Sequence, residues 1–473
     1  MNADSPNVET LCARVLGSAS SDHSGLELGD AFASTCTELV KRTSRSAEDR
    51  VRVGQVFAEK GAFELIGACL DRGDETASLT AVSKLMRNLC AGVAQNQRNI
   101  ASLAPKFISI LSQGPAGDDD SELLHLACAQ ALVNLVASCD ENKGPMLRAI
   151  DIKTFLGFHT SKVARTALMV IYNCMLCDSE ATFVAESTAS IDALLETGAR
   201  LVQSHDQESS QWVFWILGLC FSARPKSLPD AWQRHAAPPL TSPSQILLLE
   251  ALMECWNVPA CEGDLDRIRW PLSKEKGPES PSFDALSNFA FLTVLCMRLV
   301  PQAESDMEGK SAVDATLDRV LRLLGKLTSG GLEFNENENL HVWSRELLPC
   351  ILNHLRWCLE KKAPEDRKSN ALRVLANMCF RCEAHQDAVR ELGHLSTVLN
   401  CCNYDENSAM LREWGLLAIR NLCEGNSANQ DTISQIRLHG VSAEQNTSGS
   451  VLQKAGLKAE IMQDGKIKIS KKE

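Results

Sequence analysis

A six-residue pattern of apolar positions around one asparagine recurs along the chain. In each copy the residues three and two places before the Asn, and one and two places after it, are apolar. Because successive residues of an α-helix are about 100° apart, these four positions share one side of a helix and the Asn lies off that side. The pattern therefore predicts helices with one buried stripe, and we call the Asn place of each copy its anchor position. The copies are LMRNLC (85–90), ALVNLV (131–136), VIYNCM (170–175), VLANMC (374–379) and AIRNLC (418–423), and WILGLC (215–220) has Gly218 at the anchor position.

The spacing of the anchor positions indicates the kind of repeat. Successive anchors in the first half of the chain are 46, 39 and 45 residues apart, and the last two are 44 residues apart. Periods of about 40 to 47 residues are typical of armadillo and HEAT repeats, whereas ankyrin and tetratricopeptide periods are shorter. One such unit cannot cover its own apolar stripe, so neighbouring units must stack. We predict an all-α, right-handed, armadillo/HEAT-like helical-repeat solenoid with a long groove.

A second signal stands eight residues after four of the anchors. A polar residue just before a new apolar rhythm is typical of a helix N-cap, so we expect these residues to cap a short first helix. Gly61 and Gly393 then predict a break before a second helix, and the anchor helix is the third of each unit. The four expected caps are Asn96, Asn142, His385 and Asn429.

The repeat pattern is regular in the first and last parts of the chain and is interrupted between them, which predicts three segments. We expect armadillo-like repeats over residues 1–221, and degenerate helical repeats with Pro-, Ser- and charge-rich insertions over 222–365. The last segment, 366–473, ends in KAEIMQDGKIKIS, which alternates apolar and polar residues around Asp464-Gly465. Asp-Gly suits a tight hairpin turn, so we expect a small C-terminal β-hairpin there.

Composition narrows the class of protein. Hydrophobic residues make up 44% of the 473 residues and aromatic residues only 5%, which favours helices over strands. The net charge of −12 argues against binding to nucleic acid or an anionic membrane surface. The apolar run from Trp212 to Phe221 is far shorter than the roughly 18 residues of a membrane span, and we expect a cytoplasmic protein whose 19 cysteines are reduced.

Two short motifs could indicate a metal site or a phosphate-binding loop, but neither requires that interpretation. Cys379, Cys382, Cys401 and Cys402 could suggest a zinc site, but Cys379 and Cys382 fall on the buried stripe and packing explains them. The string EGKS (308–311) lacks the earlier Gly that a phosphate-binding loop needs. We find no catalytic motif, and we expect no enzyme activity, no cofactor and no bound metal.

The anchor residues are the main candidates for a binding site. An Asn amide can both donate and accept hydrogen bonds, so a row of them along a groove could hold the main chain of a partner protein. Lys84 and Arg373 stand four places before their anchors, and Trp414 stands seven places before its own, so these side chains could complete the groove wall. The alternative is that the same amides only bridge adjacent repeats. The anchor asparagines are Asn88, Asn134, Asn173, Asn377 and Asn421.

The last hundred residues resemble the conserved C-terminal domain of the ataxin-10 family. The resemblance is carried by LANMCFRCEAHQDAVREL (375–392), by REWGLLAIRNLCEGNSANQD (412–431) and by VLQKAGLKAE (451–460), with His385 where the family has Asn. LMRNLCAGVAQNQRNI (85–100) resembles the family's N-terminal repeat. The resemblance implies a non-enzymatic, cytoplasmic scaffold that binds other proteins, linked to cytokinesis, the centrosome or basal body, and neuronal signalling.

Two other functions remain open at this point. The anchor asparagines are similar to those of the importin-α family of transport adaptors, although that family has Trp four places before the Asn and this chain does not. A guanine-nucleotide exchange factor for a Gα subunit, similar to the synembryn family, would use the same kind of scaffold. The sequence does not identify the partner or the oligomeric state.

Overall fold

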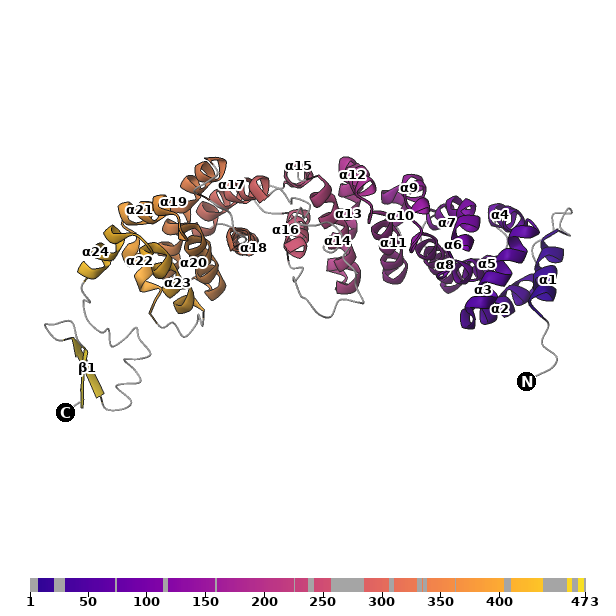
Figure 1. Cartoon of the computed structure of the whole chain (residues 1–473), viewed down its shortest axis with the longest axis horizontal. Helices are drawn as coiled ribbons and strands as arrows, with labels where there is room; N and C mark the ends of the chain where they lie inside the picture. The colour runs from indigo at the N-terminus through magenta and orange to yellow at the C-terminus, as the bar shows by residue number, and fades with distance from the viewer. Residues whose placement is uncertain are drawn as a thin grey trace. The chain divides into compact units, whose positions relative to one another are not determined.

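Helices make up nearly all of the described chain (Figure 1). The structure is a computed structural model, and its contacts divide the chain into two units: Met1–His235 with Pro243–Pro281, and Ala236–Ser242 with Ser282–Glu473. No helix in the described ranges is both long and apolar enough to cross a bilayer. The described residues are 7–20, 30–72, 75–113, 118–157, 160–224, 226–236, 242–256, 285–305, 310–329, 334, 338–361, 363–403, 410–436, 457–461 and 467–471.

In the N-terminal unit, six helices pack side by side in chain order, each against the next. They include the helices expected around the first four anchors, and we call this row the third helices. They are α2 (Asp30–Arg45), α5 (Thr76–Cys90), α8 (Asp119–Val136), α11 (Ser161–Cys174), α14 (Gln207–Ala223) and α16 (Pro243–Trp256).

Other helices of this unit precede each third helix, usually as a pair, as the three-helix repeat predicts. The first members of successive pairs pack together, as α3, α6, α9 and α12 do. These helices are α1 (Val8–Ser20), α3 (Ala47–Glu59), α4 (Ala62–Arg72), α6 (Ala94–Ile100), η1 (Ala101–Leu103), α7 (Ala104–Leu111), α9 (Asp140–Ala149), α10 (Ile152–Leu156), α12 (Asp178–Glu186), α13 (Thr188–Gln203) and α15 (Ser227–Arg234).

The C-terminal unit has three third helices, which are α18 (Lys310–Ser329), α20 (Glu365–Cys379) and α23 (Leu411–Cys423). One long helix precedes α18 and another precedes α20: α17 (Ala285–Glu304) and α19 (Glu338–Glu360). Before α23 the pair returns as α21 (Glu383–Glu391) and α22 (Leu395–Asn400), and α24 (Ser427–Gln435) follows. The expected segments 1–221, 222–365 and 366–473 stay a prediction; the described part of the middle segment is built from α15 to α19.

The buried stripe of the third helices lies where the sequence pattern predicts it. Side chains three and two places before the anchor, and one and two places after it, are fully buried on α5 and on α20. These residues are Leu85, Met86, Leu89 and Cys90 on α5, and Val374, Leu375, Met378 and Cys379 on α20.

The chain turns back after a third helix through a left-handed residue four places beyond the anchor. That residue is Gly92 (φ 71°) or Gly425 (φ 74°) in two repeats, and Ser138 (φ 62°) or Arg381 (φ 51°) in two others. Gly61 (φ 66°) and the glycine at 393 (φ 73°) form the expected breaks between first and second helices. Glycine reaches these angles without steric cost, which explains its recurrence at both breaks.

The C-terminal residues form a two-stranded antiparallel sheet, as expected. Strand β1 (Leu457–Ile461) pairs with β2 (Ile467–Lys471), with Leu457 opposite Lys471 and Ile461 opposite Ile467. The expected turn residues Asp464-Gly465 lie outside the described residues.

Candidate functional site: the third-helix surface

Three positions of each third helix form one strip along it. Residues four and seven places before an anchor lie about 40° and 20° from it around the helix, so all three positions face the same way. We call the strips of one unit its third-helix surface. In the C-terminal unit this surface consists of Arg319, Arg322 and Lys326 on α18, Asn370, Arg373 and Asn377 on α20, and Trp414, Leu417 and Asn421 on α23. Of these nine side chains, Asn421 alone is buried.

Four anchor asparagines connect adjacent repeats. Each donates a hydrogen bond from its Nδ2 to a backbone carbonyl on the preceding third helix, and that carbonyl belongs to the residue just before the preceding anchor position. These amides are therefore used within the protein rather than being open to a ligand. The bonds are Asn88 to Val40 (3.1 Å), Asn134 to Arg87 (2.8 Å), Asn377 to Gly325 (3.0 Å) and Asn421 to Ala376 (2.8 Å).

Asn173 differs from the other anchors. Its half-buried side chain makes no hydrogen bond in the described chain. Beside it on α11, Tyr172 packs edge-to-face on Trp212 of α14 at 5.3 Å between ring centroids, and Trp212 packs on Trp215 at 4.9 Å. An aromatic cluster thus connects these two third helices where an amide bridge connects others.

The structure brings Arg373 and Trp414 together. The Arg373 guanidinium lies 5.5 Å from the centre of the Trp414 ring, a cation–π contact between α20 and α23. The aliphatic part of the Arg373 side chain packs against Gly325 of α18. A Cβ atom added to Gly325 would lie only 3.2 Å from Arg373 Cδ. The Arg373 Nε is buried without a hydrogen-bond partner, and burial lowers the pKa of this guanidinium. Lys84 lies in the other unit, half-buried on α5 and without an ion pair in the described chain.

Sequence reasoning missed two anchor positions. The carbonyls that accept from Asn88 and Asn377 show that Lys41 on α2 and Lys326 on α18 occupy the anchor places of their helices. A Thr two places after each Lys could have revealed these positions in the sequence. The Asn88 and Asn377 amides also donate to these threonines, to Thr43 Oγ1 (3.4 Å) and Thr328 Oγ1 (3.1 Å). The missed α18 contributes three cationic residues to the third-helix surface.

The prediction that the residues eight places after the anchors are N-caps is wrong. Asn96, Asn142, His385 and Asn429 are each the third residue of a short helix, and all four are buried. Each asparagine bridges two carbonyls of the preceding repeat through its Nδ2, one near the end of that repeat's third helix and one on its first helix. The pairs are Leu89 and Arg50 for Asn96, Leu135 and Gln97 for Asn142, and Leu422 and Gln386 for Asn429, at 2.8–3.1 Å.

His385 performs the same bridge with an imidazole. Its Nδ1 lies 2.8 Å from the Met378 carbonyl and its Nε2 lies 2.7 Å from Ser344 Oγ on α19. Burial lowers the pKa of His385, which favours the neutral ring. A neutral ring that donates from Nδ1 accepts from the Ser344 hydroxyl at Nε2.

The cysteines lie in packed positions. Cys379, Cys382 and Cys401 are buried, and burial raises the pKa of each thiol. Within the described ranges, no three His, Cys, Asp or Glu side chains converge as a metal site would require. The Gly of EGKS lies outside the described residues.

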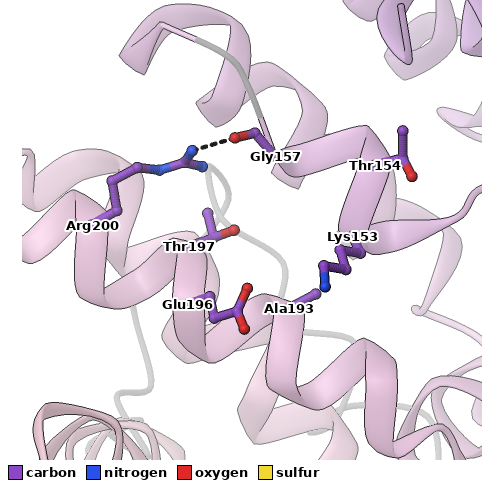
Figure 2. Close-up of a pocket in the computed structure, with 7 residues that line it drawn as sticks. All are labelled: Lys153, Thr154, Gly157, Ala193, Glu196, Thr197 and Arg200. Carbon is purple, nitrogen blue, oxygen red and sulfur yellow. Dashed lines mark hydrogen bonds between the residues drawn. The ribbon is translucent and has the colours of Figure 1, made fainter. Parts of the chain in front are cut away.

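A surface pocket of about 500 Å³ lies elsewhere, between α10 and α13 (Figure 2). Figure 2 shows Lys153 of α10 extending toward Ala193 of α13, and Thr154 on α10 and Glu196 and Thr197 on α13 also line the pocket. Arg200 closes one end by donating to the carbonyls of Gly157 (2.6 Å) and Leu156 (2.7 Å). The pocket contains none of the expected site residues. Arg200 is already used within the protein, because it donates to the free carbonyls at the C-terminal end of α10.

Short helix pairs and stacked third helices define an armadillo-like repeat protein. Among solved structures, a designed armadillo repeat protein is 13% identical with a TM-score of 0.37, and the match covers 53% of this chain and 100% of that one. An engineered protein is 14% identical with a TM-score of 0.41, covering 88% of this chain and 99% of that one.

Sequence comparison then identifies the family. Residues 367–470 match the family model described as the spinocerebellar ataxia type 10 protein domain. Ataxin-10 of Xenopus tropicalis is 33% identical over 418 residues, which cover 81% of this chain and 79% of the relative. Ataxin-10 of Bos taurus is 22% identical over 458 residues, covering 89% and 86%. The chain belongs to the ataxin-10 family.

Proposed function

We propose that this protein is a non-enzymatic scaffold that binds partner proteins on the third-helix surface of its C-terminal unit. The observation that carries the proposal is the Arg373–Trp414 pair of the C-terminal unit. A half-buried cation that lies on an aromatic face, with no acid beside it in the described part of the chain, is a feature of binding surfaces, where Trp and Arg are enriched. The neighbouring anchor amides, Asn377 and Asn421, already form hydrogen bonds between repeats. The long side chains that project between them are therefore the ones that would contact a partner protein.

The cellular role in this proposal follows the family. A cytoplasmic ataxin-10-type scaffold would act in cell division or in signalling at the centrosome, basal body or midbody. The partners would be other proteins, with no nucleic acid and no membrane insertion.

Proximity labelling in dividing cells of the native organism tests the proposal. The test variant combines Arg373→Gln with Trp414→Ala, and the control is Lys84→Gln, a cation at the equivalent place on α5. Asn377 and Asn421 are left intact, because their loss would weaken the fold. Loss of division or centrosomal neighbours in the test variant alone supports the proposal, and neighbours unchanged in both variants refute it.

A further inference from the structure

Positive charge on the third helices is concentrated in the C-terminal unit. Four of the nine residues of its third-helix surface are cationic and none is acidic. On α2, α5, α8, α11 and α14, the fifteen equivalent positions include two cations, Lys41 and Lys84. The contrast occurs in a chain whose net charge is −12. The four cations are Arg319, Arg322, Lys326 and Arg373.

Among the described residues, nearby acids leave the charge of Arg322 and Arg373 largely uncompensated. Asp314 and Asp318 are held by the buried Arg367 at 2.8 and 2.7 Å, so that arginine neutralises part of their charge. Asp366 lies 3.9 Å from Arg322, but both side chains are exposed, and such a pair contributes about 1 kcal/mol or less. Arg373 has the Trp414 ring as its neighbour and pairs with no carboxylate of the described residues.

We infer that the third-helix surface of the C-terminal unit binds an extended acidic segment of a partner protein. Carboxylates of that segment pair with Arg322 and Arg373, and an apolar residue packs on Trp414. This inference rests on the proposed function and adds the chemistry of the partner.

The dimensions of an extended chain fit this arrangement. Packed helices lie about 8–10 Å apart, and side chains on one face of an extended strand recur about every 7 Å. Acidic residues two places apart share one face of the extended segment and therefore reach Arg322 on α18 and Arg373 on α20 together. Arginine pairs with carboxylates in a two-pronged geometry, which orients the segment as well as attracting it.

A nucleic acid is a poorer occupant of the same surface. The net charge of the whole chain opposes association with a phosphate backbone. Trp414 is the single aromatic residue among the nine positions, whereas single-stranded nucleic acids are bound by successive stacking rings.

Fluorescence anisotropy with the full chain tests the inference. The probe is a short fluorescein-labelled peptide of alternating Glu and Ser with a central Leu, and a peptide with Gln in place of Glu is its control. Arg322→Gln with Arg373→Gln is compared with Lys41→Gln plus Lys84→Gln, which removes the same charge from equivalent positions of the N-terminal unit. Circular dichroism establishes that both variants are folded.

We expect the first double variant to lose about tenfold in affinity for the Glu peptide, which corresponds to about 1.4 kcal/mol, and the second to lose less than about twofold. The difference should shrink at high salt. Equal losses in both variants, equal binding of the Gln peptide, or tighter binding of an oligothymidylate would each overturn the inference. If one of these occurs while Arg373→Gln with Trp414→Ala still loses its cellular neighbours, acidic recognition is wrong and the scaffold proposal stands.

Discussion

Three anchor asparagines of the N-terminal unit offer a graded test of the bridging role. Asn88 donates to two acceptors, Val40 O and Thr43 Oγ1; Asn134 donates to one, and Asn173 to none in the described chain. All three stand near the ends of third helices in one unit. Replacing each by Ala therefore changes the number of bridges between repeats, and Asn88→Ala also removes the Oδ1 that accepts from the Arg87 guanidinium (3.0 and 3.1 Å).

The expected energies follow from that number. Ala is a better helix former than Asn by about 0.5 kcal/mol, so Asn173→Ala should stabilise the protein by about that amount. Asn134→Ala also loses one hydrogen bond of about 1 kcal/mol, which gives a net loss of about 0.5 kcal/mol. Asn88→Ala leaves two acceptors without their donor and should lose about 1.5 kcal/mol.

Urea unfolding followed by far-UV circular dichroism measures the series. At constant m-value, the shift of the midpoint gives the change in the free energy of unfolding. Similar losses in all three variants would refute the bridging account, as would the largest loss in Asn173→Ala.

Other substitutions probe the buried network. Gly54→Ala would place a methyl group against the Asn96 amide, and we expect a loss of about 2 kcal/mol that becomes smaller when Asn96→Ala is added, measured by a double-mutant cycle in urea. Burial lowers the pKa of His385 below that of the unfolded chain, so its contribution is full above about pH 6.5 and is lost as the pH falls. His385→Asn, which restores the residue of the other repeats, should therefore reduce the loss of Tm between about pH 7 and pH 5; an unchanged pH profile would contradict this. Arg367→Ala leaves two aspartates without their buried partner and should lower the free energy of unfolding by about 3 kcal/mol, measured by denaturant titration, whereas a loss below about 1 kcal/mol would show that the pair contributes little.

The sequence predicted the fold well because burial repeats with a period. The four apolar positions around each anchor are buried where neighbouring repeats stack, as on α5 and α20. The third helices α2 and α18 were not recognised because Lys replaces Asn at positions 41 and 326, and an apolar stripe without the Asn resembles that of any amphipathic helix.

The roles of the polar residues were harder to predict. An Asn before an apolar run occurs both at N-caps and within first turns, and the sequence shows no difference between the two. Asn96 and its equivalents prove to be buried bridges because carbonyls from two helices of the preceding repeat meet there. That meeting depends on tertiary packing, which the local sequence does not show. The contact of Arg373 with Trp414 likewise depends on two helices that are distant in sequence.

Hydroxyl-radical footprinting of the full chain, with and without a partner identified by proximity labelling, tests the binding surface most directly. Trp414 lies on the third-helix surface, and Met410, 53% exposed, is the N-cap of α23, four places before Trp414. Phe183 on α12 and Leu392 after α21, 45% and 46% exposed, are oxidisable controls away from it. We predict that the partner protects Trp414 and Met410 from oxidation and leaves both controls unchanged; protection of the controls without protection of Trp414 would contradict the account.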